Sequence, residues 1–100
     1  DRYIGSLIRT RVAQGSGPIK VMTEFREMGI SPSAVEVHEE WQKVDWLNIA
    51  KGIRAKRFGV DSPSDFSQKM KQMQFLQRRG FSHSLIKQVI DEIHELDLSF

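Results

Sequence analysis

The sequence repeats itself once, and this repeat limits the chain to a fold built from two similar units. Shifted by 51 positions, residues 21–40 align with residues 72–91. The aligned pairs include Met22 with Met73, Gly29 with Gly80, Ser31 with Ser82, and Ser33 with Ser84. A helix–glycine–apolar–serine–helix pattern therefore occurs twice. Units that cannot bury their apolar faces alone are typical of repeat proteins, whose stacked units form long binding surfaces.

The spacing of apolar residues predicts helices throughout the chain. Steps of three and four residues, which follow one face of a helix, recur in six segments. These segments are residues 3–12, 21–28, 34–41, 46–53, 66–76 and 85–96. No segment alternates with a period of two over a useful length, so we expect no sheet. We predict an all-α fold of two tandem three-helix repeats packed side by side, residues 1–43 and residues 44–100, with a longer first loop in the second.

Local signals mark where several of these helices begin and end. Three prolines, which favour the first position of a helix, stand at expected starts: Pro18, Pro32 and Pro63. Asp45 is expected to cap a fourth start, and residues 62–65 resemble a capping box. Gly29 and Gly80 predict left-handed helix ends, each followed by a helix that a serine caps. We expect both glycines to set the angle between helices.

The composition narrows the classes of function. The chain of 100 residues lacks cysteine, which excludes disulfides and thiolate chemistry and fits a reducing cytoplasm. It has no apolar run long enough to span a membrane and no visible signal peptide. Its histidines, His38, His83 and His94, lack partners at metal-ligand spacing, and no catalytic motif is present. We therefore expect a cytoplasmic, non-enzymatic monomer without metal or cofactor, with His38 in the core.

Charge is unevenly distributed along the chain. Residues 51–79 contain eight Lys and Arg but two Asp, whereas residues 80–100 contain one Lys and four acidic residues. A basic middle beside an acidic end suggests a polyanion or a mixed-charge partner. We assign Arg57 to the end of its helix, where cations are favoured. The candidate binding residues are Lys51, Arg54, Lys56, Lys69, Lys71, Arg78 and Arg79.

Phe75 is the apolar residue that fits the pattern least well. It lies about 180° from Phe66 around its helix, and Glu24 occupies its place in the first repeat. Either a neighbouring helix buries it or a partner does. We favour burial between the two repeats.

The alternative function is a stand-alone nucleic-acid-binding module of helix-turn-helix type. The segments at 25–35 and 76–86 both resemble that turn. However, Phe25 and Leu76 occupy the position where close helix crossing favours a small residue. The following helices are also acidic, which opposes entry into a groove lined by phosphates.

Several short motifs together resemble the RecX family of regulators of the RecA recombinase. In chain order they are Tyr3 with Arg9 and Arg11, Gly17-Pro18, the helix end at Gly29-Ile30, Asp45-Trp46, and FLQRRGFSHSLI at 75–86. They cover nearly the whole chain and follow the family's order. Members of the family usually carry one further repeat first, so the chain resembles the last two repeats.

The resemblance implies a function that the residue patterns alone do not provide. It implies a non-enzymatic regulator of homologous recombination and the SOS response that binds RecA nucleoprotein filaments. Such a regulator would modulate, and most often inhibit, RecA ATPase activity and strand exchange. Its partners would be the RecA filament and single-stranded or double-stranded DNA, with no membrane. The family offers no catalytic motif to transfer.

Overall fold

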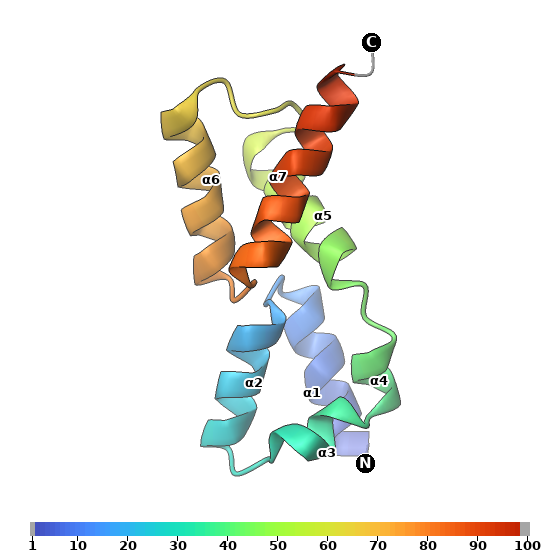
Figure 1. The fold of residues 1–100 in the computed structure, drawn as a ribbon. Helices are drawn as coiled ribbons and strands as arrows, with labels where there is room; N and C mark the ends of the chain where they lie inside the picture. Colours follow the sequence, from blue (N-terminus) through green and yellow to red (C-terminus); the bar gives the residue numbers. More distant parts are fainter. Residues whose placement is uncertain (1, 99–100) are drawn as a thin grey trace.

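The structure, a computed structural model, is an elongated all-helical array (Figure 1). It describes the backbone of residues 2–98 and the side chains of residues 2–93. The helices are α1 (Arg2–Ala13), α2 (Pro18–Glu27), α3 (Pro32–Glu36), α4 (Glu39–Gln42), α5 (Trp46–Phe58), α6 (Phe66–Arg78) and α7 (His83–Leu98). The principal extents are 46 × 23 × 20 Å. The predicted all-α class is confirmed.

The predicted count of six helices is corrected, because the third expected helix is two short ones. The backbone leaves the helix after α3, and His38 begins α4 by capping it. The His38 Nδ1 atom accepts a hydrogen bond from the backbone N–H of Glu40 at 3.1 Å. The ring also lies against α1, where a Cβ at Gly5 would approach its Cε1 atom to 2.9 Å. His38 therefore has a structural role at this break in the helix.

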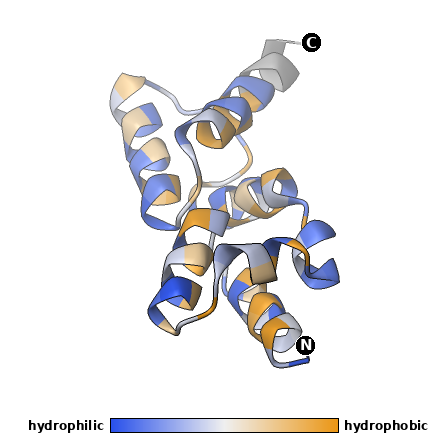
Figure 2. Cartoon of the chain, turned by 60° about the horizontal axis from the view of Figure 1, so that its bottom comes forward, coloured by the Kyte–Doolittle hydropathy of each residue, from blue (hydrophilic) through white to orange (hydrophobic). Residues whose placement is uncertain are grey.

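Two hydrophobic clusters form the core, one among α1–α4 and the other among α5–α7. Figure 2 shows that the helices carry hydrophobic and hydrophilic residues together, as expected for elements buried on one side. The buried residues of the first cluster are Ile8, Val21, Phe25 and Val35. Those of the second are Ala50, Leu76, Phe81, Ile86 and Val89. Trp46 packs against both clusters. The division into repeats at residues 1–43 and 44–100 stays a prediction, and Val44 packs against the first cluster.

The predicted helix starts are mostly confirmed, with one error. Pro18 and Pro32 each open a helix, and Asp45 caps α5. The start predicted at Pro63 is wrong, because α6 begins at residue 66. There the Asp65 side chain accepts a hydrogen bond from the Gln68 N–H at 2.8 Å. Residues 59–65 instead form the longer loop of the second repeat.

The glycine–serine turns of the two repeats have the same local geometry. Gly29 and Gly80 have φ values of 82° and 96°, in the left-handed region that favours glycine. Ser31 and Ser82 each accept a hydrogen bond, at 3.3 Å, from the backbone N–H three residues later. The predictions for both turns are confirmed.

The surroundings of the two turns differ, because only the second turn contacts the other repeat. The N–H groups of Gly17 and Ile19, at the start of α2, donate to the carbonyls of Arg79 and Gly80 at 2.6 and 2.9 Å. A Cβ at Gly80 would lie 2.4 Å from the Cβ of Lys20, whereas one at Gly29 would meet nothing within 4 Å. The repeats therefore touch backbone to backbone at the α6–α7 turn.

Alanine substitutions at Gly29 and Gly80 should separate two destabilising effects. One is the strain of a positive φ, and the other is the steric clash of a Cβ with α2. We expect Gly29→Ala to lower the free energy of unfolding by about 1 kcal/mol, because of its positive φ. Gly80→Ala should lower it by roughly 1–3 kcal/mol more, because its Cβ also collides with α2. Urea unfolding followed by circular dichroism would measure both values. Equal losses would show that α2 moves away from the turn without cost.

Candidate binding surface between the repeats

The seven predicted basic residues do not share one surface. The structure places them in three environments: the interior, positions beside carboxylates, and a cleft between the repeats together with the adjoining face of α6. Only the last environment brings several of them together without neutralising them.

Arg54 lies in the interior, and its prediction as a binding residue is corrected. Only 1% of the residue is exposed. Its Nε donates to Gln72 Oε1 at 2.8 Å, its Nη1 donates to the Gly59 carbonyl at 3.1 Å, and its Nη2 donates to the Asp61 carbonyl. Because these groups occupy the guanidinium, Arg54 joins α5 to α6 and holds the loop at residues 59–65.

Removing this buried guanidinium should destabilise the protein. We expect Arg54→Met to lower the free energy of unfolding by about 2–4 kcal/mol, because Gln72 and two carbonyls lose their donor in the interior. The matched control is Lys56→Met on the same helix, where an exposed side chain should change it by about 0.5 kcal/mol or less. Thermal or urea unfolding of both variants is the measurement. Similar losses would contradict the structural role of Arg54.

Lys51 and Lys69 lie beside carboxylates. Lys51 forms an ion pair with Glu92 of α7. The hydrogen bond from Lys51 holds the pKa of the Glu92 carboxyl below its usual value, against a smaller effect of burial. Lys69 lines a hollow that also contains Asp65 and Asp91. Both lysines therefore have local negative neighbours and are weaker candidates for a partner contact.

The Lys51–Glu92 pair should make stability depend on acidity. Folding lowers the pKa of Glu92. The pair therefore stabilises the folded state fully at pH values above the unfolded-state pKa of about 4.3. This stabilisation is lost as the pH falls through the lower folded-state pKa, because Glu92 is then protonated. We expect Glu92→Gln to be less stable than the parent at pH 7 and equally stable near pH 2. Urea midpoints at both pH values measure this. A difference that persists in acid would show that Gln disturbs packing instead.

Lys56, Arg57 and Arg79 line one cleft between the repeats. The cleft has a volume of about 350 Å³ and lies where the end of α1 approaches α5 and α6. None of the described residues that line it is acidic; they are Ala13, Gln14, Gly15, Ile53, Lys56, Arg57, Phe75 and Arg79. Three cations thus converge on one hollow. Such a site favours binding of an anion, because no acidic side chain among these lining residues balances the positive charge.

Phe75 contacts two of these three cations. The Cζ atoms of Arg57 and Arg79 lie over its ring, 5.8 and 5.4 Å from the centroid. Phe58 meets the same ring edge-on at 5.3 Å. Arg79 also donates from Nη1 to the carbonyl of Gln14 in the first repeat, at 3.0 Å. Cation–π attraction does not use the N–H groups, so those of Arg57 and the remaining ones of Arg79 stay available to a partner.

The sequence-based interpretation of Phe75 changes accordingly, and that of Arg57 is extended. Phe75 is half-buried against α5 and borders the cleft, so it is not enclosed between the repeats as predicted. Arg57 lies in the last turn of α5, as predicted, and its contact with the Phe75 ring is a further feature that the sequence pattern does not indicate. In the first repeat, Glu24 at the equivalent position pairs with Arg11 at 2.5 Å. The second repeat has an aromatic contact where the first has an ion pair.

Two further cations continue this surface along α6. Lys71 and Arg78 are exposed and lie four residues before and three residues after Phe75, which places all three on one side of the helix. Together with the three cations that line the cleft, these two form what we call the basic surface. Its members are Lys56, Arg57, Lys71, Arg78 and Arg79. None of them forms an ion pair with a carboxylate among the residues described.

Neither a cluster of metal ligands nor a membrane-spanning helix is found among the described residues. Within the part of the chain that the structure describes, no group of three or more potential metal ligands occurs. Over the same residues, no helix combines the length and the apolar character needed to cross a bilayer. The fold and the basic surface together define a class: an all-helical protein with a positively charged candidate binding surface.

Comparisons with known proteins assign the chain within this class. The family described as "RecX, third three-helix domain" matches residues 43–90. A regulatory protein RecX from Halorhodospira halophila is 36% identical over 86 residues, which cover 86% of this chain and 53% of the relative. The one from Legionella pneumophila is 33% identical over 92 residues, covering 92% and 61%. The one from Acidithiobacillus ferridurans is 33% identical over 93 residues, covering 93% and 97%.

The chain belongs to the RecX family, as its motifs indicated. It spans between half and two thirds of the length of the Halorhodospira and Legionella relatives. These relatives are named as regulatory proteins, which agrees with the prediction of a non-enzymatic role.

Proposed function

We propose that this protein binds the RecA nucleoprotein filament and inhibits RecA ATPase activity and strand exchange. It would thereby regulate homologous recombination and the SOS response in the cytoplasm, acting as a monomer. Membership of the RecX family supports the partner, and the basic surface supports the place of contact. The observation that carries this proposal is the convergence of Lys56, Arg57 and Arg79 in a cleft without an acidic neighbour among its described lining residues.

A nucleoprotein filament suits such a surface because it presents two kinds of negative charge. DNA phosphates attract Lys and Arg without regard to sequence, and acidic side chains of the protein coat pair with arginine forks. The cations of the basic surface lie on α5 and α6 and are available to these negative groups. Lys51 of α5 is not, because it is paired with Glu92 of α7. Direct contact with single-stranded or double-stranded DNA is part of the proposal.

Neutralising the basic surface should weaken regulation without unfolding the protein. We expect the triple variant Lys56→Gln, Lys71→Gln, Arg78→Gln to bind filaments about tenfold more weakly, since three charge contacts of roughly 0.5 kcal/mol each are lost. Inhibition of RecA ATPase on single-stranded DNA should fall in parallel. Titration of the variant against preformed filaments, with hydrolysis followed continuously, measures both.

A triple variant of equal charge change provides the control. Lys20→Gln, Arg26→Gln, Lys69→Gln removes three exposed cations that lie outside the basic surface. It should bind filaments within about twofold of the parent, apart from the general loss of positive charge. Equal weakening by the two triples would place the contact elsewhere. A parent protein that neither binds filaments nor alters ATP hydrolysis would overturn the proposed function itself.

A further inference from the structure

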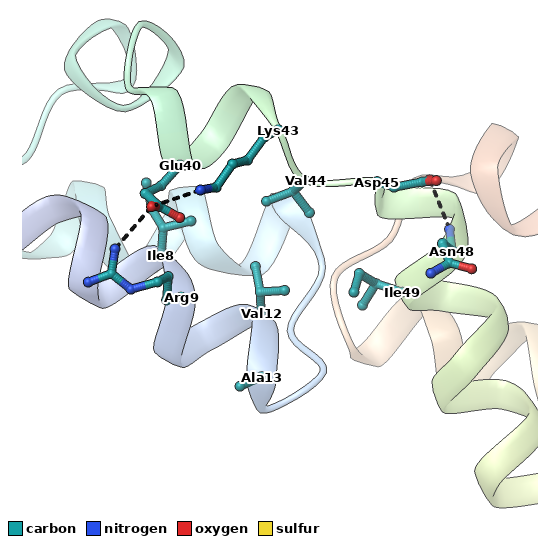
Figure 3. A pocket seen from close by; sticks show the side chains of 10 residues that line it. All are labelled: Ile8, Arg9, Val12, Ala13, Glu40, Lys43, Val44, Asp45, Asn48 and Ile49. Carbon is teal, nitrogen blue, oxygen red and sulfur yellow. Dashed lines mark hydrogen bonds and ion pairs between the residues drawn. The ribbon is translucent and has the colours of Figure 1, made fainter.

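A second cavity shares the lining residue Ala13 with the basic cleft, and we call the two hollows together the groove. The second cavity has a volume of about 390 Å³ and lies between α1, α4 and the start of α5. Figure 3 shows the side chains of Val12, Val44 and Ile49 gathered around this space. Ala13 lines both this cavity and the basic cleft. The two hollows therefore meet at the end of α1.

One face of α5 forms a continuous wall of this groove. Asp45, Ile49, Ile53 and Lys56 follow one another at helical spacing, the first two in one cavity and the last two in the other. The groove thus runs from the α4–α5 linker to Phe75.

The two ends of the groove differ in charge. Near the linker, the Glu40 carboxylate pairs with Arg9 and Lys43, both at 3.1 Å. The hydrogen bond from Lys43, followed by that from Arg9, lowers the pKa of Glu40. Asp45 lines the same cavity, so two carboxylates balance the two cations at this end. At the other end, Arg57 and Arg79 have no carboxylate partner among the described residues. The groove has an apolar floor and one basic end.

These features fit a protein segment better than a nucleic acid. Single-stranded nucleic acids bind to aromatic platforms on which bases stack, but the Phe75 ring already carries two guanidinium groups and the edge of Phe58. An apolar floor also gives no gain to a sugar–phosphate backbone. Grooves of this kind receive apolar side chains from a helical or extended segment, while arginine forks bind carboxylates in bidentate fashion.

We infer that this groove receives an acidic–apolar segment of a protein partner. Apolar side chains of the segment cover Val12, Ile49 and Ile53, and an Asp or Glu that follows them binds Arg57 and Arg79. The inference rests on the proposed function in taking that partner to be the RecA subunit of the filament. It places a protein contact in the groove and leaves DNA to the exposed cations of α6.

Filling the groove with a neutral side chain separates these possibilities. Ala13 is exposed at the end of α1, so Ala13→Gln blocks the junction of the two cavities without a change of charge. Ala34→Gln on α3 makes the same chemical change at an exposed position outside both cavities. We expect Ala13→Gln to bind RecA filaments at least tenfold more weakly than Ala34→Gln. Binding of either variant to a naked oligothymidine strand should match the parent.

Each other outcome removes a specific part of the inference. Equal filament binding by the two variants would overturn the groove contact while the proposed function stands, provided the parent binds filaments. A proportional loss of oligothymidine binding by Ala13→Gln would show that the groove holds nucleic acid. A parent that does not bind filaments would overturn both proposals together.

A photo-crosslink tests the same contact without relying on lost affinity. Benzoylphenylalanine at position 13, irradiated in the filament complex, should attach to a RecA peptide that contains apolar residues beside Asp or Glu. Mass spectrometry identifies the peptide, and position 34 provides the matched control. Attachment to DNA, or to a peptide without acidic residues, would overturn the inference.

Discussion

The backbone contact between the start of α2 and the α6–α7 turn is the constraint on which the rest of the structure depends. Two N–H groups at the start of α2 donate to the carbonyls of residues 79 and 80. The two backbone segments therefore touch directly, without a side chain between them. A Cβ at Gly17 would lie 2.5 Å from the Gly80 carbonyl. This close approach fixes one repeat on the other, and it brings Gln14 within reach of Arg79.

The two repeats share a framework but differ where a binding surface is needed. Their turns use the same glycine and serine geometry, because both must reverse the chain over an apolar core. The exchange of Glu24 for Phe75 alters the electrostatics without altering the helices. An acidic residue in the second repeat would pair with the nearby arginines, as Glu24 pairs with Arg11. The aromatic ring instead orders two guanidinium groups and leaves their charge unbalanced.

Burial decides the role of each cation more than its position in the sequence does. Arg54 and Arg57 stand three residues apart on α5, yet the first is enclosed and fully bonded while the second lies at the edge of a cleft. Charge counting treats the two alike. The loop at residues 59–65 makes the difference, because its carbonyls turn back over the end of α5 and accept hydrogen bonds from Arg54.

The sequence by itself determined the features that depend on neighbouring residues: the internal repeat, the helical period, the serine caps, the left-handed glycines, and the motifs that identify the family. Local hydrogen bonds and apolar spacing are encoded within a few residues, so pattern suffices for them. The break at His38, the interior place of Arg54 and the cleft beside Phe75 were decided only by tertiary structure. Each depends on contacts between distant segments, such as that between Arg79 and Gln14, which no local pattern specifies.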